Sequence, residues 1–166
     1  MRYILIDYGM VSINDIDINH YHLDIIRNNI IYVSEKEMLF DGSLYNNICL
    51  GKDIDSKIFD KVTKLLKIDD ICNGNYDMRI EDGGFNLSSG ERQRVILCRS
   101  ILIEREVYIF DESFNQLDIK MEKLLLQISS IFNNLVTLSN NLSSTFLFNV
   151  IFLYKLPENN NSFSLT

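Results

Sequence analysis

The chain lacks the long apolar run that a membrane-spanning helix requires. Its longest apolar stretch, Phe146–Tyr154, is interrupted by Asn149 and has the length of a strand, whereas a spanning helix needs about 20 apolar residues. The first residues also lack the layout of a secretory signal peptide. We therefore expect no membrane span, and a protein in the cytoplasm or on the cytoplasmic face of a membrane.

Residues that bind zinc or form disulfide frameworks are scarce. The three cysteines, Cys49, Cys72 and Cys98, are widely spaced without a CxxC motif, and the only histidines are His20 and His22. An odd number of scattered cysteines predicts neither a disulfide framework nor a zinc site. We expect reduced thiols, and histidines with surface or packing roles.

Basic residues are outnumbered by acidic ones. The chain has 16 Lys and Arg against 23 Asp and Glu, a net charge of −7 and a pI of about 4.8. Nucleic-acid binding needs clustered positive charge to neutralise phosphates, so we expect no nucleic-acid partner. With 166 residues, of which 46% are hydrophobic, the chain corresponds to one ordinary domain or a piece of one and can bury a core.

Hydrophobic periodicity predicts helices that alternate with strands. The predicted strands are 3–6, 10–18, 30–33, 107–110, 135–138 and 150–154, and the predicted helices are 20–27, 44–48, 54–66, 88–103 and 119–132. This order indicates an α/β fold with a mostly parallel sheet. We expect residues 1–48 and 105–156 to form the α/β core portion, 49–104 a helical insertion, and 157–166 a disordered polar tail.

The segment LSSGERQR, residues 87–94, carries the first chemical signal. Ser88 with Glu91 three residues later is a capping box, which by itself predicts only a well-built helix start. The other interpretation is an anion site. Ser88 and Ser89 offer hydroxyl donors, Gly90 permits close approach to the backbone, and the helix N-terminus favours negative charge.

The segment VYIFDE, residues 107–112, carries the second signal. Ligands of open α/β sheets bind beyond the carboxyl ends of strands, where Asp111 and Glu112 would lie. One acid suits a Mg²⁺ ligand and the other a group that orients water. The alternative is an acidic turn after a core strand.

Taken in order, these segments resemble the ATP-binding cassette of exporter-type ABC transporters, and most nearly those of peptide and bacteriocin exporters. LSSGE is similar to the LSGGQ signature, VYIFDE to the Walker B strand, and NQLD, residues 115–118, to the D-loop. Residues 31–48 are similar to the Q-loop and the run that follows it. Asp82-Gly83-Gly84 falls just before the signature, and the resemblance covers residues 9–155. It implies a P-loop NTPase-like fold with a helical signature subdomain.

The resemblance assigns roles by position. Asp111 would bind Mg²⁺, and Glu112 would act as general base or orient water. The signature residues Ser88, Ser89, Gly90 and Glu91, with Asp118 of the D-loop, would contact ATP.

Two further catalytic positions depart from the family pattern. Glu35 stands in place of the Q-loop Gln and adds negative charge, and Asn140 stands in place of the switch His and cannot carry a proton. Ser89 replaces a signature Gly, which is the mildest change.

The largest departure is the absence of a P-loop, G-x-x-x-x-G-K-[ST], anywhere in the sequence. In the family this loop lies just before the stretch that resembles residues 9–17. We therefore expect a cassette that is incomplete on its N-terminal side, inactive alone, unable to hold ATP in its own site, and poorly stable or self-associating in isolation.

Because ATP sites of this family form between two cassettes, the implied partners are a second cassette and a transporter membrane domain. One alternative is a non-catalytic module that docks on an intact cassette or membrane domain through residues 49–104. Another, the head of a chromosome-maintenance ATPase, is disfavoured because such heads follow long coiled coil, whereas the exporter-like run MLFDGSLYNNI occurs here.

Overall fold

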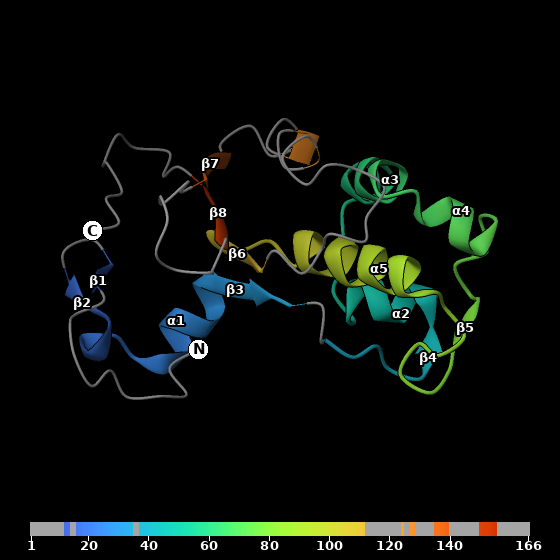
Figure 1. Cartoon of the computed structure of the whole chain (residues 1–166), viewed down its shortest axis with the longest axis horizontal. Coiled ribbons are helices and arrows are strands. Elements are labelled where there is room, and N and C mark those ends of the chain that lie inside the picture. Colours follow the sequence, from blue (N-terminus) through green and yellow to red (C-terminus); the bar gives the residue numbers. More distant parts are fainter. Residues whose placement is uncertain are drawn as a thin grey trace, which may run out of the picture.

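The computed structural model describes residues 12–13, 16–34, 37–111, 124, 127–128, 135–139 and 150–155. These residues form a sheet with one group of helices beside it (Figure 1). The predicted strand 3–6 and the tail 157–166 lie outside the described residues.

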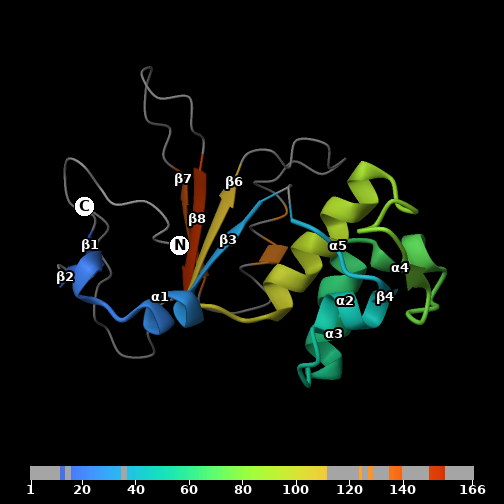
Figure 2. The same ribbon diagram turned by 90° about the horizontal axis from the view of Figure 1, so that it is seen from below.

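The sheet has four strands in the order β3, β6, β8, β7. They are β3 (Ile30–Val33), β6 (Val107–Asp111), β7 (Leu135–Ser139) and β8 (Val150–Lys155). β3 pairs parallel with β6, while β8 lies antiparallel between β6 and β7. Three strands therefore share one direction and β8 opposes them, and Figure 2 shows the four side by side. The predicted α/β class is confirmed.

Short elements lead into the sheet. β1 (Ser12–Ile13) and β2 (Ile16–Asp17) form an antiparallel pair, followed by the 3₁₀ turn η1 (Ile18–His20) and by α1 (Leu23–Asn29). The prediction of one continuous strand over residues 10–18 was wrong, because the chain reverses direction between β1 and β2. The Asp17 carboxylate accepts a hydrogen bond from the Asn19 amide at 2.7 Å and caps the turn that follows.

The helical group contains α2 (Leu44–Cys49), α3 (Ser56–Leu65), α4 (Ile68–Cys72) and α5 (Ser89–Leu102), with the two-stranded pair β4 (Gly42–Ser43) and β5 (Arg79–Ile80). The predicted helices 44–48, 54–66 and 88–103 are confirmed to within two residues at each end. α4 and the β4–β5 pair were not predicted.

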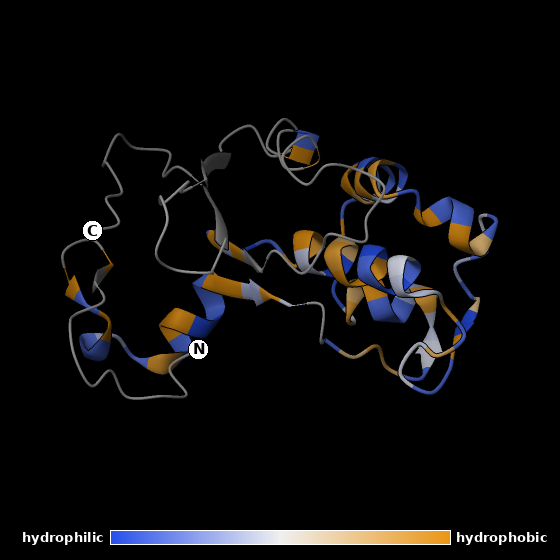
Figure 3. Cartoon of the chain, viewed as in Figure 1, coloured by the Kyte–Doolittle hydropathy of each residue, from blue (hydrophilic) through white to orange (hydrophobic). Residues whose placement is uncertain are grey.

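Helix α5 is the centre of this group. Every residue from Val95 to Leu102 is buried, and the helix contacts α2, α3, α4 and β3. Figure 3 shows polar residues in its first turns and apolar ones in the turns nearest β6. The buried half of α5 therefore joins the helical group to the sheet, while its polar first turn lies at the exposed end of the helix.

Few residues of the predicted helix 119–132 are described. Leu124, Gln127 and Ile128 are helical, and Leu124 and Ile128 are buried in the same core as α5. The boundaries 1–48, 49–104 and 105–156 stay a prediction.

None of the helices among the described residues is long and apolar enough to cross a membrane. The same residues contain no cluster of His, Cys, Asp and Glu that could hold a metal ion. Cys49, Cys72 and Cys98 are all buried free thiols.

Candidate functional site

The N-terminus of α5 is built by a complete capping box. The Ser88 amide donates to Oε2 of Glu91 at 2.8 Å, and the Ser88 hydroxyl donates to the same oxygen at 2.7 Å. In return Oγ of Ser88 accepts from the Glu91 amide at 3.3 Å. These bonds from the Ser88 side chain and backbone lower the pKa of Glu91. The capping-box prediction is confirmed, and Glu91 carries a negative charge at neutral pH.

The same helix end is open to solvent. Ser88 and Ser89 are exposed and Gly90 is half-buried. The first amides of a helix have no intrahelical acceptor, so those of Ser89 and Gly90 are available in principle to an outside anion. The Glu91 carboxylate opposes such an anion, because it adds a like charge at the same end of the helix.

A tight turn precedes this helix and packs on the segment 37–41. Gly84 has a φ of +90°, and a Cβ placed there would lie 3.0 Å from Cδ1 of Leu39. The Gly83 amide donates to Oδ1 of Asp41 at 3.4 Å. The glycines at 83 and 84 are therefore required by a left-handed backbone and, at Gly84, by close approach to Leu39.

Near the other end of α5, Arg99 binds the same segment. Its Nη2 lies 3.1 Å from Oε2 of Glu37 and donates to the Met38 carbonyl at 3.1 Å. The guanidinium also lies over the Phe40 ring, 5.6 Å from its centroid. Only 5% of the Arg99 side chain is exposed, against 31% for Glu37, so the arginine charge is almost wholly removed from water and depends on these partners.

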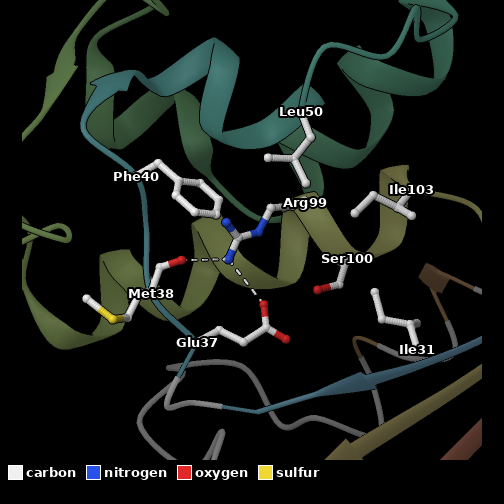
Figure 4. A pocket seen from close by; sticks show the side chains of 8 residues that line it. All are labelled: Ile31, Glu37, Met38, Phe40, Leu50, Arg99, Ser100 and Ile103. Carbon is white, nitrogen blue, oxygen red and sulfur yellow. Dashed lines mark hydrogen bonds and ion pairs between the residues drawn. The ribbon is translucent and has the colours of Figure 1, made fainter. Parts of the chain in front are cut away.

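These residues border a pocket of about 360 Å³ (Figure 4). It lies between the C-terminal half of α5, β3 and the loops around residues 38 and 50. Its lining residues are Ile31, Glu37, Met38, Phe40, Leu50, Arg99, Ser100 and Ile103. Three of them expose large apolar side chains: Met38 is 71% exposed, Phe40 60% and Leu50 43%. An apolar rim around a buried charge suits the side chains of another protein segment better than a small polar ligand.

The structure brings together only some of the predicted site residues. Ser88, Ser89, Gly90 and Glu91 share the first turn of α5. Asp111 ends β6, where it pairs with Val150 in the sheet. The remaining four, Glu35, Glu112, Asp118 and Asn140, lie outside the described residues, and their roles stay predictions.

The pocket and its arginine were missed at the sequence level. One signal was present: Arg99 interrupts the apolar run VILCRSIL, residues 95–102. A lone charge in a buried helical segment indicates a paired or hydrogen-bonded group. The partner was not identifiable from the sequence, because Glu37 lies 62 residues away along the chain.

The buried thiols offer no second chemistry. Burial raises the pKa of Cys98 and, despite a hydrogen bond with Tyr45, that of Cys49. A thiol whose pKa is raised is a poor nucleophile at neutral pH. Cys49 and Cys98 therefore serve as small apolar core residues.

Comparisons with known proteins agree with this arrangement. Over 143 residues the chain is 32% identical to a sublancin-168-processing and transport ATP-binding protein of Bacillus subtilis, an alignment that covers 84% of this chain and 20% of the relative. It is 34% identical over 128 residues to a lactococcin-G-processing and transport ATP-binding protein of Lactococcus lactis, covering 74% of the chain and 17% of the relative. The chain thus spans about a fifth of the length of these curated relatives.

A solved structure shows the same fold. A bacterial Atm1-family ABC exporter with ATP bound superposes with a TM-score of 0.62 at 26% identity, over 76% of this chain and 22% of the exporter chain. Residues 3–115 match the family model described as ABC transporter. The fold and these matches together place this chain in the ABC transporter family.

Proposed function

We propose that this chain forms the signature-bearing part of an ATP-binding cassette that powers export of a peptide or similar substrate, on the cytoplasmic face of a membrane. The observation that carries the proposal is the N-terminal end of α5, where Ser88 and Ser89 are exposed and a complete capping box fixes the first turn. In this role Ser88, Ser89 and Gly90 contact the phosphates of an ATP molecule that a second cassette holds.

The 166 residues contain no P-loop to hold a triphosphate beside Asp111 and Glu112. Backbone amides and a lysine normally supply that grip. We propose that the chain by itself binds ATP weakly and does not hydrolyse it. Given a P-loop from outside these residues, Asp111 holds Mg²⁺ and Glu112 orients the attacking water, and Glu35, Asp118 and Asn140 complete the site.

The pocket beside Arg99 supports a second contact, with the membrane domain of the transporter. Met38, Phe40 and Leu50 offer exposed apolar side chains around it. The relatives are transport ATP-binding proteins several times longer than this chain, so a membrane-domain segment is the occupant that we propose.

A non-catalytic docking module is the second candidate. The observation that favours it is that the signature end and the pocket need no P-loop to form. The two candidate functions predict different effects of a substitution at Glu112. A cassette that receives a P-loop loses hydrolysis with Glu112→Gln, whereas a docking module is unaffected by this substitution.

Association with an intact ABC cassette, measured by sedimentation velocity with and without ATP and Mg²⁺, tests the proposal. The probe is the isolated cassette of the Bacillus subtilis relative, with its own hydrolysis blocked by mutation. We expect ATP-dependent association that Ser89→Glu weakens at least about tenfold, because the new carboxylate meets the bound phosphates.

Ser56→Glu is the matched control. Ser56 is also an exposed first residue of a helix, α3, and follows an aspartate cap. An acid at this position suits the helix dipole in both variants, so neither destabilises the fold. Equal weakening by both variants, or association that ignores ATP, would contradict the proposal.

A further inference from the structure

The segment Glu37–Asp41 is attached to both ends of α5. Near the C-terminal end, Arg99 binds the Glu37 carboxylate and the Met38 carbonyl. At the N-terminal end, the turn that precedes Ser88 contacts this segment, through Gly84 on Leu39 and the Gly83 amide on Asp41.

The anchors are close neighbours along the chain, which makes this a direct link. Arg99 holds Glu37 and the Met38 carbonyl, while the turn at Gly83 and Gly84 contacts Leu39 and Asp41. Met38 and Leu39 are adjacent, so a shift of the backbone at the Arg99 anchor is passed directly to the residue that packs against the turn.

The middle of the segment is fixed to α2. The Asn47 side chain accepts from the Phe40 amide at 2.8 Å and donates to the Phe40 carbonyl at 2.7 Å. Asn47 is only 2% exposed. The backbone of Phe40 is thus held by Asn47, while its ring borders the pocket. An occupant of the pocket therefore contacts a segment whose backbone is anchored to both α2 and α5.

We propose that Arg99 is a positioning residue for the signature. By holding Glu37 and the Met38 carbonyl, it fixes the 37–41 segment along α5 and links the pocket to the turn before Ser88. The functional consequence of this link rests on the proposed function. A partner that docks at Met38 and Phe40 then changes the position of Ser88 and Ser89 relative to ATP. The link is reciprocal: engagement of the signature alters the affinity of the pocket for its occupant.

Amide hydrogen exchange of the isolated chain tests the link without any partner. Glu37→Gln removes one charge of the pair and keeps the side-chain shape. We expect exchange in residues 37–41 to rise about tenfold and in residues 82–91 at least about threefold, with α3 unchanged as the check on folding. Glu81→Gln is the matched control, since Glu81 pairs with Arg79 at 4.0 Å on the exposed surface, and we expect no change from it.

Arg99→Lys provides a second variant. Lysine keeps the charge but not the planar fork, so it binds Glu37 without holding the Met38 carbonyl equally well. We expect the exchange of residues 82–91 in Arg99→Lys to lie between that of wild type and that of Glu37→Gln. Exchange in 82–91 that is unchanged in Glu37→Gln, whether or not 37–41 changes, would overturn the proposal.

ATP-dependent association with the intact cassette separates this inference from the proposed function. If wild type associates, Glu37→Gln should associate at least about threefold more weakly, and equal association would overturn the inference. If wild type does not associate, the proposed function fails, and the exchange of residues 82–91 still decides whether Arg99 positions the signature.

Discussion

Ser88 and Glu91 bond each other in both directions across the first turn of α5. The glutamate oxygen accepts from the Ser88 hydroxyl and amide, and the Ser88 oxygen accepts from the Glu91 amide. The helix start is therefore rigid, but it carries a negative charge where the proposed function requires a phosphate to approach. This conflict between a good cap and an anion site gives the first two predictions.

Glu91→Gln should keep the helix start and improve the anion site. Glutamine at this position still forms a capping box, and it removes a charge that repels phosphate. We expect urea unfolding to change by less than about 0.5 kcal/mol and ATP-dependent association with an intact cassette to strengthen about threefold at low salt. Association that weakens would contradict this interpretation of Glu91.

The cap should also depend on pH. Because the pKa of Glu91 is lowered in the folded state, its contribution to stability is present above the ordinary value of 4.5 and is lost as the pH falls through the lowered pKa. Urea unfolding of wild type and Glu91→Gln from pH 7 to acid measures this contribution. As the pH falls below 4.5, the free energy of unfolding of wild type should decrease relative to that of Glu91→Gln. A difference that is constant with pH would contradict it.

Ser88→Ala removes the cap itself. We expect a loss of about 1 kcal/mol in the free energy of unfolding, because the Glu91 amide and carboxylate both lose a partner. Ser56→Ala, at the first position of α3 rather than at its cap, is the control and should change stability by less than half as much. Similar losses in both variants would show that the capping box does not stabilise α5.

Gly84→Ala should be more costly than Gly74→Ala. Both glycines have a positive φ, +90° and +77°, but only Gly84 would place a Cβ near another residue, 3.0 Å from Leu39, whereas nothing lies within 4 Å at Gly74. We expect about 1 kcal/mol of backbone strain in each, and a further 1 kcal/mol or so at Gly84 from the contact. Thermal and urea unfolding measure both, and equal losses would show that the turn does not pack on Leu39.

Glu37→Ala should destabilise the chain by about 2 kcal/mol, because the guanidinium of Arg99 is left buried with one fewer partner. The value lies below that for a fully buried pair, since 31% of the Glu37 side chain is exposed. Glu81→Ala, from an exposed pair, should cost less than about 0.5 kcal/mol. Urea unfolding of both variants at neutral pH measures the difference, and equal losses would contradict the burial argument.

Local sequence signals predicted most of the fold. The β-branched run Ile30–Val33 and the apolar run at 107–110 became paired strands, and the Ser88–Glu91 pattern marked the start of α5 to the residue. Among the features that were not predicted, the β4–β5 pair is non-local. β4 and β5 have two residues each and pair Ser43 with Arg79, too short for any periodicity to appear.

The candidate site also has one part that the sequence predicted and one part that it did not. The first turn of α5 was predictable because a capping box lies within four consecutive residues. The pocket was not, since two of its lining residues, Arg99 and Glu37, form an ion pair between parts of the chain that are 62 residues apart. The positions taken from the family resemblance alone, such as Glu112, remain to be tested by experiment.

The most direct test of the account is isothermal titration of ATP and Mg²⁺ into the purified 166-residue chain. Without a P-loop to grip the triphosphate, we predict no binding tighter than about 1 mM and no turnover. A micromolar Kd with hydrolysis that Glu112→Gln abolishes would contradict the central claim that these residues can act on ATP only when another polypeptide segment holds it.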